Sequence, residues 1–490
     1  MKTTKFKSIV KKGNNQGVGF ISVSFEERNF FSINDQIRII LNSKIEFFSR
    51  IKFYGTIGFY VPYKIMVQNK LLGKGIGVEV KKIDGFFTSI GDDGRIYIPQ
   101  NIAEKYFLKS GDITEIEFKT NNENIIKYCL IHFRKRKNTK EYMCMFDFKR
   151  PGQEGIFRLV RKLPKGLQNH KLPKELLKNF NFAEIDNKRV INYYGNRMPI
   201  IINSNININK IAHYLGCYFA IGTKRGNNWG ICASTFEQTV YFKEMHNWLI
   251  EDARIVFSIT YTDPKNENKY ILENKLIHIW KKNTGIELRW IYVRIIPTKY
   301  KNAQNRNPYG SLIFKENREL TRIYYVRLLN FLLNKIKRDN DKQLALDFIL
   351  GVLEGDGSVS AKKRGHVIIT SNYKELKILE EIVKVTGINY KLYMEGKNKG
   401  YIRIWSLELI KNISILKDKL FKYYPKRRKI LKKRLAQTGC SRFLLGKSEK
   451  TSNWLIGQLN NYEILDGKGN LTESGKKIQK DLKKFLLSKD

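Results

Sequence analysis

The chain is poor in cysteine and histidine, and neither residue type is spaced for a metal site or a disulfide framework. Its five cysteines include no Cys-x-x-Cys pair, and its six histidines show no metal-ligand spacing. This distribution argues against a zinc ribbon and against a disulfide-stabilised fold. Cys217 and Cys232 lie in apolar patterns, so we interpret them as core residues.

Long apolar runs are also missing. No run in the 490 residues approaches the roughly 18 that a membrane-spanning helix needs. The first residues, Met1 to Lys5, lack the apolar region of a secretory signal. We therefore expect a soluble protein in the cytoplasm.

Acidic residues are too few to balance the basic ones. The chain has 91 Lys and Arg residues against 46 Asp and Glu, which leaves a formal net charge of +45 and a pI near 9.9. Part of the lysine excess, together with many Ile and Asn, fits an AT-rich genome. A surplus this large still predicts polyanion binding, with a basic but non-binding surface as the alternative.

Small residues recur four positions apart in two apolar, helix-like stretches. The second stretch, residues 350–357, ends on Asp356 and a glycine, and the first, residues 215–222, ends on Ile221 and a glycine. The small residues are Gly351, Gly355 and Gly357 in the second stretch, and Gly216, Ala220 and Gly222 in the first. Positions i and i+4 share a helix face, so each stretch offers a smooth stripe to another backbone. We predict two helices packed through these stripes about a pseudo-two-fold axis.

Asp356 stands where a helix disfavours an acid, because the macrodipole places partial negative charge at the C-terminus. Such a position is understandable if a cation joins the carboxylate. Glu354 is two residues away, about 200° round the helix, and is therefore a poor substitute for it.

The two stretches resemble the motifs of the LAGLIDADG homing endonucleases, in the form that carries both motifs on one chain. In that family the residue before the final glycine is the metal-binding acid. The position is Asp356 in the second motif and Ile221 in the first. The resemblance implies that Asp356 is catalytic and binds Mg²⁺, and that the degenerate position Ile221 impairs cleavage, since its apolar side chain cannot bind a hard cation.

The same resemblance implies an α+β fold with two αββαββα units, over residues 205–340 and 341–435. The first unit has an additional predicted helix at 272–284. Antiparallel strands would lie along the major groove of DNA, with exposed strand residues contacting base edges. The candidates are Lys391, Tyr393, Arg403 and Trp405 in the second unit, and Arg289, Tyr292 and Arg294 in the first, with Arg289 on the opposite strand face from the other two. Each of them is alternatively an ordinary surface residue.

Further basic residues fit phosphate contacts. Lys224 and Arg225 follow the first motif, and Lys362 follows the second. The helix predicted from residue 423 to 434 has charge on most faces, including Lys426, Arg427 and Arg428. We predict that these side chains contact the DNA backbone, and each neutralised phosphate should steepen the log–log salt dependence by about 0.9.

Three further regions surround the two units. Residues 1–120 are β-rich with a weak internal repeat, and the third copy, from residue 94 to 112, resembles the AbrB-type swapped-hairpin domain, whose members bind DNA or protein and are often dimeric. A small β-barrel without a ligand is the alternative. Residues 121–204 are interpreted as a basic connecting region. The tail, residues 440–490, resembles a winged-helix module, which either binds DNA or docks on its neighbour.

These observations leave two main hypotheses. One is a site-specific double-stranded DNA-binding protein of the homing endonuclease type, with impaired metal-dependent cleavage or nicking. The other is a nuclease-dead, sequence-specific transcriptional regulator. An RNA-binding maturase on the same scaffold has no separate support, and an intein origin is not expected because no splicing-domain pattern surrounds the core. We expect a nucleoid-associated protein with a monomeric core, and the N-terminal region is the candidate for dimerisation.

Overall fold

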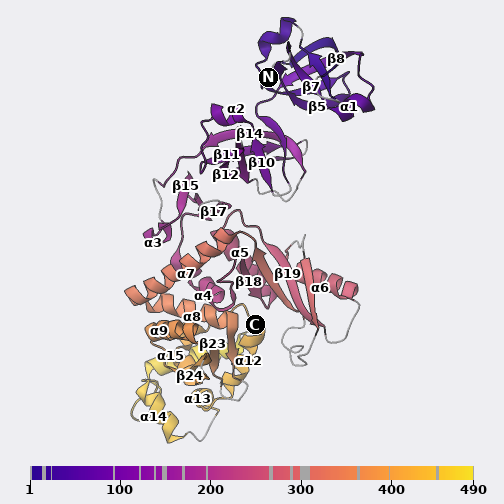
Figure 1. Ribbon diagram of the computed structural model, residues 1–490. Helices are drawn as coiled ribbons and strands as arrows, with labels where there is room; N and C mark the ends of the chain where they lie inside the picture. The colour runs from indigo at the N-terminus through magenta and orange to yellow at the C-terminus, as the bar shows by residue number, and fades with distance from the viewer. Residues whose placement is uncertain are drawn as a thin grey trace. The chain divides into compact units, whose positions relative to one another are not determined.

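The computed structural model is a mixed α and β protein that divides into two compact bodies (Figure 1). The N-terminal body contains residues 1–168, 181–186 and 191–199, and the C-terminal body contains the rest. The structure describes residues 3–13, 18–23, 25–53, 55–91, 94–120, 123–136, 139–145, 152–167, 172–194, 197–263, 269–286, 291–297, 309–360, 365–396, 398–447 and 452–488. No helix among these residues has both the length and the apolar character needed to cross a membrane. The predicted α+β class is confirmed.

A strand–helix–strand unit occurs three times in the N-terminal body. Pro62 and Pro99 stand directly before the second and third helices, with φ near −57° and ψ near 140°. Proline suits this position, because its ring presets φ and the first helical N–H groups have no partner in the helix anyway. The units are β3 (Gly19–Ser22), η1 (Phe25–Phe30) and β4 (Gln36–Leu41); β7 (Ile57–Val61), α1 (Tyr63–Gln68) and β8 (Gly75–Lys82); and β10 (Arg95–Ile98), α2 (Gln100–Lys105) and β11 (Ile113–Lys119).

The strands of this body enclose two apolar cores. The first core lies between the sheets β1-β8-β4-β5 and β2-β3-β7-β6. The second belongs to the sheet β10-β13-β12-β11-β14-β9, where Phe118 and Phe157 stack at 4.5 Å. The remaining strands are β1 (Thr3–Ile9), β2 (Lys11–Lys12), β5 (Ile45–Arg50), β6 (Lys52–Phe53), β9 (Phe86–Ser89), β12 (Asn124–Arg136), β13 (Thr139–Met145) and β14 (Glu154–Lys162). Strands β12, β13 and β14 lie within residues 121–204, for which the sequence predicts a connecting region. The elements that follow in this region are α3 (Lys174–Leu177), β15 (Asn181–Asp186), β16 (Arg189–Tyr193) and β17 (Ile200–Asn203).

The two motif stretches form the helices α4 (Ile208–Ile221) and α8 (Lys342–Asp356), which pack against each other in the C-terminal body (Figure 1). Asn207 and Asp341 cap their N-termini through side-chain oxygens. A Cβ atom added to Gly216 would lie 2.1 Å from the carbonyl oxygen of Phe348, and one added to Gly351 would lie 1.9 Å from that of His213. The small residues therefore let two backbones touch.

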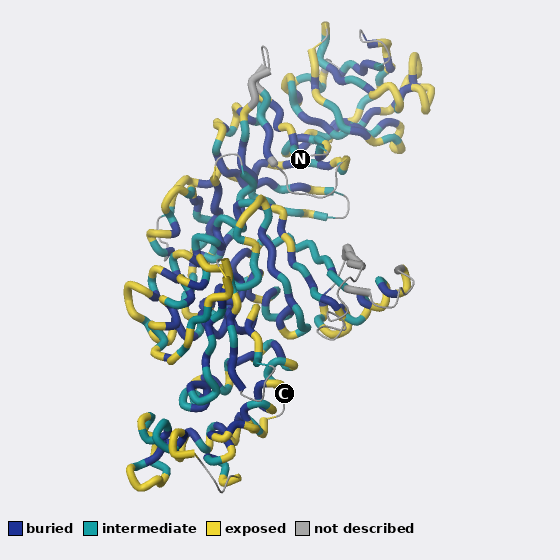
Figure 2. Tube along the Cα trace, turned by 60° about the horizontal axis from the view of Figure 1, so that its bottom comes forward, coloured by how far each residue is buried: buried dark blue, intermediate teal, exposed yellow. Residues whose placement is uncertain are grey.

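Each motif helix is followed by a four-stranded sheet. The first has the order β18-β21-β19-β20 and the second the order β22-β23-β25-β24. The glycine directly after each motif helix forms an antiparallel β-bridge with a strand of the sheet that follows. Gly222 pairs with Ile231, and Gly357 pairs with Ile369. The strands are β18 (Trp229–Ala233), β19 (Val256–Asp263), β20 (Ile291–Pro297) and β21 (Ser311–Glu316), then β22 (Gly357–Val359), β23 (Val367–Asn372), β24 (Tyr390–Glu395) and β25 (Lys399–Ile404). Along several of these strands buried residues alternate with more exposed ones (Figure 2).

One strand of the first sheet departs from the antiparallel expectation. Strand β20 pairs with β19 in parallel. The inserted helix predicted at 272–284 is present as α6 (Lys269–Thr284), between these two strands. A crossover helix lets the chain return in the same direction, which a tight hairpin cannot do. The other helices between residues 205 and 420 are α5 (Phe236–Leu249), α7 (Glu319–Asp339), α9 (Tyr373–Thr386), α10 (Ser406–Lys411) and α11 (Ile413–Leu416).

The C-terminal residues form helices that pack on neighbouring elements of the same body. The elements are α12 (Pro425–Ala436), α13 (Gly439–Leu444), α14 (Asn453–Asn461) and α15 (Glu473–Leu487). Helix α15 packs on α11 and α12. Asp481 forms an ion pair with Lys417 at 2.6 Å, and the Lys432 ammonium donates to the Ser488 carbonyl at 2.8 Å.

The glycine contact can be tested with one methyl group. Gly351→Ala should lower the free energy of unfolding by about 2–3 kcal/mol, because the new Cβ collides with backbone that cannot move alone. Gly457→Ala is the matched control: this glycine also lies within a helix, but its Cβ would meet open space, so alanine should be neutral or stabilising. Chemical denaturation of both variants is the measurement. Equal stabilities would contradict the contact.

Candidate active site and nucleic-acid interface

Asp356 and Ile221 end the two motif helices. Asp356 is solvent-exposed and is the last residue of α8, while Ile221 is half-buried and is the last residue of α4. Partial burial of its carboxyl group raises the pKa of Asp356, the Arg427 guanidinium lowers it, and Glu375 raises it. The C-terminus of α8 thus carries a carboxylate, and the C-terminus of α4 carries a branched hydrocarbon side chain.

Arg427 is the cation at the end of α8. Its Nη1 donates to the carbonyl oxygens of Leu353, Glu354 and Gly355, at 3.4, 3.1 and 3.2 Å. The guanidinium also lies 3.9 Å from the ring centroid of Tyr424. A cation at a helix C-terminus can contribute up to about 2 kcal/mol when partly buried. A side chain of α12 therefore supplies positive charge beside Asp356.

Lys224 has the corresponding place at the end of α4. Its ammonium donates to the Phe219 carbonyl at 2.6 Å and forms an ion pair with Glu375 of α9. Glu375 also accepts hydrogen bonds from Ser371 Oγ at 2.5 Å and from Asn372 Nδ2 at 2.7 Å. Lys224, a predicted phosphate contact, is thus already bonded within the protein.

Glu354 is completely buried, although it lies only two residues before Asp356. Neither carboxyl oxygen has a hydrogen-bond partner among the described residues. Burial raises its pKa to about 7, against smaller lowering effects of the Tyr423 backbone, Arg427 and Gln238. A carboxyl group that is completely buried does not complete the acid pair at the C-terminal ends of the two helices.

The donor set at this base fits a divalent cation only in part. Mg²⁺ is held in many phosphoryl-transfer sites by one or two carboxylates, with water and phosphate oxygens completing the shell. Asp356 provides one exposed carboxylate, and Glu375 is neutralised by Lys224. Within the described part of the chain, no group of three or more His, Cys, Asp and Glu residues could hold a metal ion.

The second sheet brings its predicted DNA contacts together on one face. In the antiparallel register Lys391 lies opposite Arg403, and Tyr393 lies opposite Tyr401. The two tyrosine rings stack at 4.8 Å, and the Arg403 guanidinium lies 4.7 Å from the Tyr393 ring and 5.5 Å from that of Trp405. Tyr401 was missed from the sequence, although it alternates with buried Ile402 in the way that selected the others.

The first sheet is less informative about its candidates. Arg294 and Tyr292 lie in β20, opposite Thr260 and Ser258 of β19. Arg289 and Lys362 lie outside the described residues. Arg225 lies just after α4 and is exposed.

The basic helix α12 has both outward and inward cations. Lys426 is exposed, whereas Arg427 and Arg428 are half-buried. Arg428 donates to the carbonyl oxygens of Leu420 and Lys417, at 3.2 and 2.6 Å. Sequence alone could not separate these roles, because a run of adjacent basic residues places charge on every side of a helix.

A polar network that no motif indicated is buried beside α4. His246 joins Glu316 through Nε2 at 2.9 Å and Tyr325 through Nδ1 at 2.8 Å. Arg318 pairs with Glu316 and with Asp252. Burial favours the neutral acid, but the bonds from His246 and Arg318 lower the pKa of Glu316 to about 2. All of these groups are internal partners, so we interpret the network as structural.

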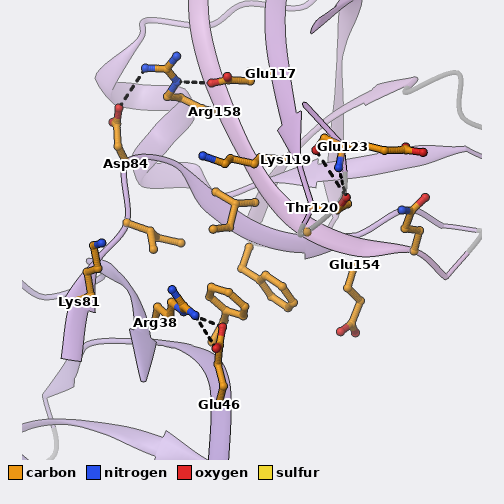
Figure 3. Close-up of a pocket in the computed structure, with 16 residues that line it drawn as sticks. Arg38, Glu46, Lys81, Asp84, Glu117, Lys119, Thr120, Glu123, Glu154 and Arg158 are labelled. Atoms are coloured by element: carbon orange, nitrogen blue, oxygen red, sulfur yellow. Dashed lines mark hydrogen bonds and ion pairs between the residues drawn. The ribbon is translucent and has the colours of Figure 1, made fainter. Parts of the chain in front are cut away.

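The N-terminal body has a hollow of about 880 Å³ (Figure 3). Arg38 pairs with Glu46 on one side, and Arg158 bridges Glu117 and Asp84 on the other (Figure 3). Five acidic and four basic side chains line it, so it does not suit a polyanion.

No family model matches the chain, and no curated protein matches it. Among solved structures it is similar to I-DmoI, a LAGLIDADG homing endonuclease, in a crystal structure with DNA and Ca. The match has 11% sequence identity and a TM-score of 0.21, and covers 43% of this chain and 90% of I-DmoI. A TM-score this low does not establish a common fold.

Because Glu354 is buried, we expect the free energy of unfolding of the protein to depend on pH. Its folded pKa is about 7 against 4.5 ordinarily, so the unfolded chain releases the proton first and stability falls as pH rises through this window. Glu354→Gln should therefore gain roughly 2–3 kcal/mol in unfolding free energy relative to the parent between about pH 5 and pH 8. Denaturation at the two pH values tests this, with exposed Glu473→Gln as the control. A pH-independent difference would contradict it.

Proposed function

We propose that the chain is a site-specific double-stranded DNA-binding protein of the LAGLIDADG homing endonuclease type, with impaired metal-dependent cleavage. The observation that carries the proposal is the contact between α4 and α8 through Gly216 and Gly351, with an exposed acid at one helix end. A four-stranded sheet follows each of these helices, which supports two related units. The second unit has the order αββαββα from α8 to α10, whereas the first has one strand, β18, between α4 and α5 and a different strand order in its sheet.

The charge and the second sheet support DNA as the ligand. The net charge of +45 favours a polyanion, and the outer face of β24 and β25 presents Lys391 and Arg403 beside stacked aromatic rings. A β-sheet face with basic side chains can enter the major groove, where each base pair has its own donor and acceptor pattern. Lys426 and Arg225 are exposed and would contact phosphates.

Any hydrolysis would depend on Asp356. A bound Mg²⁺ polarises the scissile phosphate and lowers the pKa of a bound water. Asp356 would hold the ion, while Ile221 offers no ligand at the other helix end. The arrangement therefore favours cutting at one strand over cutting at both.

The alternative is a transcriptional regulator that binds its site without cutting. Two observations favour it: Ile221 replaces an acid, and Lys224 and Arg427 supply internal positive charge at the two helix ends. A site with fixed cations has less need of a metal ion for neutralising phosphate charge.

The two hypotheses differ in one experiment. Sites are selected from a random duplex pool with the full-length protein, and a recovered site is incubated with Mg²⁺ or Mn²⁺. We expect slow scission of one strand that is lost in Asp356→Asn, because one carboxylate can hold one metal ion. Asp339→Asn, which changes the last residue of another helix, is the control and should cut normally.

Salt-sensitive binding with no scission by any variant would retire the enzyme and leave the regulator. If the protein selects no sequence at all, the DNA-binding proposal itself fails.

A second carboxylate should extend the reaction to the other strand. Ile221→Glu places an acid at the end of α4, three residues before Lys224, where the half-buried side chain already reaches solvent. We expect double-strand cleavage of the selected site in Mg²⁺, measured on end-labelled duplexes. Ile221→Gln has a similar size and no charge and should not cut the second strand.

A further inference from the structure

The C-terminal body has a hollow of about 280 Å³ where α15 meets the segment between α11 and α12. Its floor and walls include the apolar side chains of Pro425 and Phe485. The residues that line it are Lys417, Asp418, Lys422, Pro425, Arg428, Lys484, Phe485 and Ser488. Four cationic side chains and one carboxylate thus surround it, in contrast to the hollow of the N-terminal body, where acids are in excess.

Two of the cations are held in place from within the protein. The Arg428 guanidinium donates to the carbonyl oxygens of Lys417 and Leu420 and lies 5.3 Å from the Phe485 ring. Carbonyl oxygens orient a guanidinium without neutralising it, so its full charge remains. Lys417 is different, because its ion pair with Asp481 cancels its charge.

For the other two cations, no carboxylate partner is present among the residues that the structure describes. Lys422 and Lys484 are exposed, and the structure describes no ion pair for either side chain. Lys422 precedes α12 and Lys484 belongs to α15, so two separate elements bring like charges to one hollow. Asp418 balances one charge at most. A net positive charge confined to a small space is relieved when an anion enters.

We propose that this hollow is a binding site for a phosphate group, held by Arg428, Lys422 and Lys484. Guanidinium and ammonium groups are the side chains that proteins use for phosphate oxygens, the first as a planar fork and the second as a point charge. The hollow has room for a phosphate group, because its volume of about 280 Å³ is several times the roughly 30 Å³ that one water molecule occupies. The phosphate is either a backbone phosphate of bound DNA or free inorganic phosphate, and only the first source rests on the proposed function.

Bound phosphate would also connect two parts of the chain. It would bridge Lys484 of α15 to Arg428 of α12, alongside the Asp481–Lys417 pair. Phosphate binding is therefore expected to strengthen the contact between α15 and α12. The melting temperature of the protein should then rise with phosphate concentration until the site is saturated.

The test compares two double variants. Lys422→Gln/Lys484→Gln removes the two unpaired cations of the hollow. Lys429→Gln/Lys483→Gln removes the same charge from exposed lysines of α12 and α15 that do not line it. Both changes concern exposed side chains and should leave the fold intact.

The first measurement is a melting curve with increasing inorganic phosphate, at constant ionic strength kept with chloride. The parent and the control variant should gain stability with saturation, and the apparent phosphate affinity should fall about tenfold or more in Lys422→Gln/Lys484→Gln. The second measurement is the salt dependence of binding to the selected duplex. The slope should become shallower by about 0.9 in this variant alone, with the sequence preference unchanged.

The outcomes separate the two sources. A change in the phosphate titration with an unchanged salt slope assigns free phosphate, and a shallower salt slope, with or without a change in the titration, assigns a backbone phosphate of DNA. If the two variants behave alike in both measurements, the inference is overturned. If no variant binds DNA, the proposed function fails, and the phosphate measurement alone decides this site.

Discussion

Helices α4 and α8 can lie together only because Gly216 and Gly351 have no side chains. At these positions the carbonyl oxygens of Phe348 and His213 occupy the space that a Cβ would need. Each glycine inside a helix costs roughly 1 kcal/mol relative to alanine, so the close backbone contact must offset that cost. The contact also defines the site, because it brings the ends of both helices, Asp356 and Ile221, to the same part of the C-terminal body.

The ends of these helices carry a second constraint. Carbonyl groups at a helix C-terminus have no partner within the helix, and Arg427 and Lys224 satisfy several of them. Both side chains come from outside their helix, and both bring positive charge to a place where an acid would be disfavoured. The exposed carboxylate of Asp356 is therefore tolerated partly through Arg427, and a metal ion is not required to explain its position.

The C-terminal helices depend on the same body. Helix α15 buries Ile478, Leu482 and Phe485 and keeps lysines outward. Its attachment uses Asp481 and the Ser488 carbonyl, whose partners Lys417 and Lys432 lie on the neighbouring elements. A module that docks in this way can position basic residues relative to α12, which an independently tethered module could not do.

Local spacing was sufficient for several features of the fold and the site. The i, i+4 positions of Gly351 and Gly355 identified a helix face, because helix geometry alone decides which residues share one. Alternation likewise placed Lys391, Tyr393 and Arg403 on one face of the second sheet, as the register of β24 and β25 has them. The inserted helix α6 followed from its pattern too, but its consequence, a parallel strand β20, did not.

The sequence by itself thus determined the two motif helices, the inserted helix, which small residues form the stripes, and that residue 221 is an isoleucine where residue 356 is an acid; it did not identify β15, β16 and β17 within the predicted connecting region. Only the tertiary structure decided which cation lies beside Asp356, that Lys224 pairs with Glu375 across 151 residues, and that Glu354 is buried. The reason is physical. A period in the sequence reports the geometry of one element, whereas an ion pair or a capped helix end depends on which surfaces meet after the chain has folded.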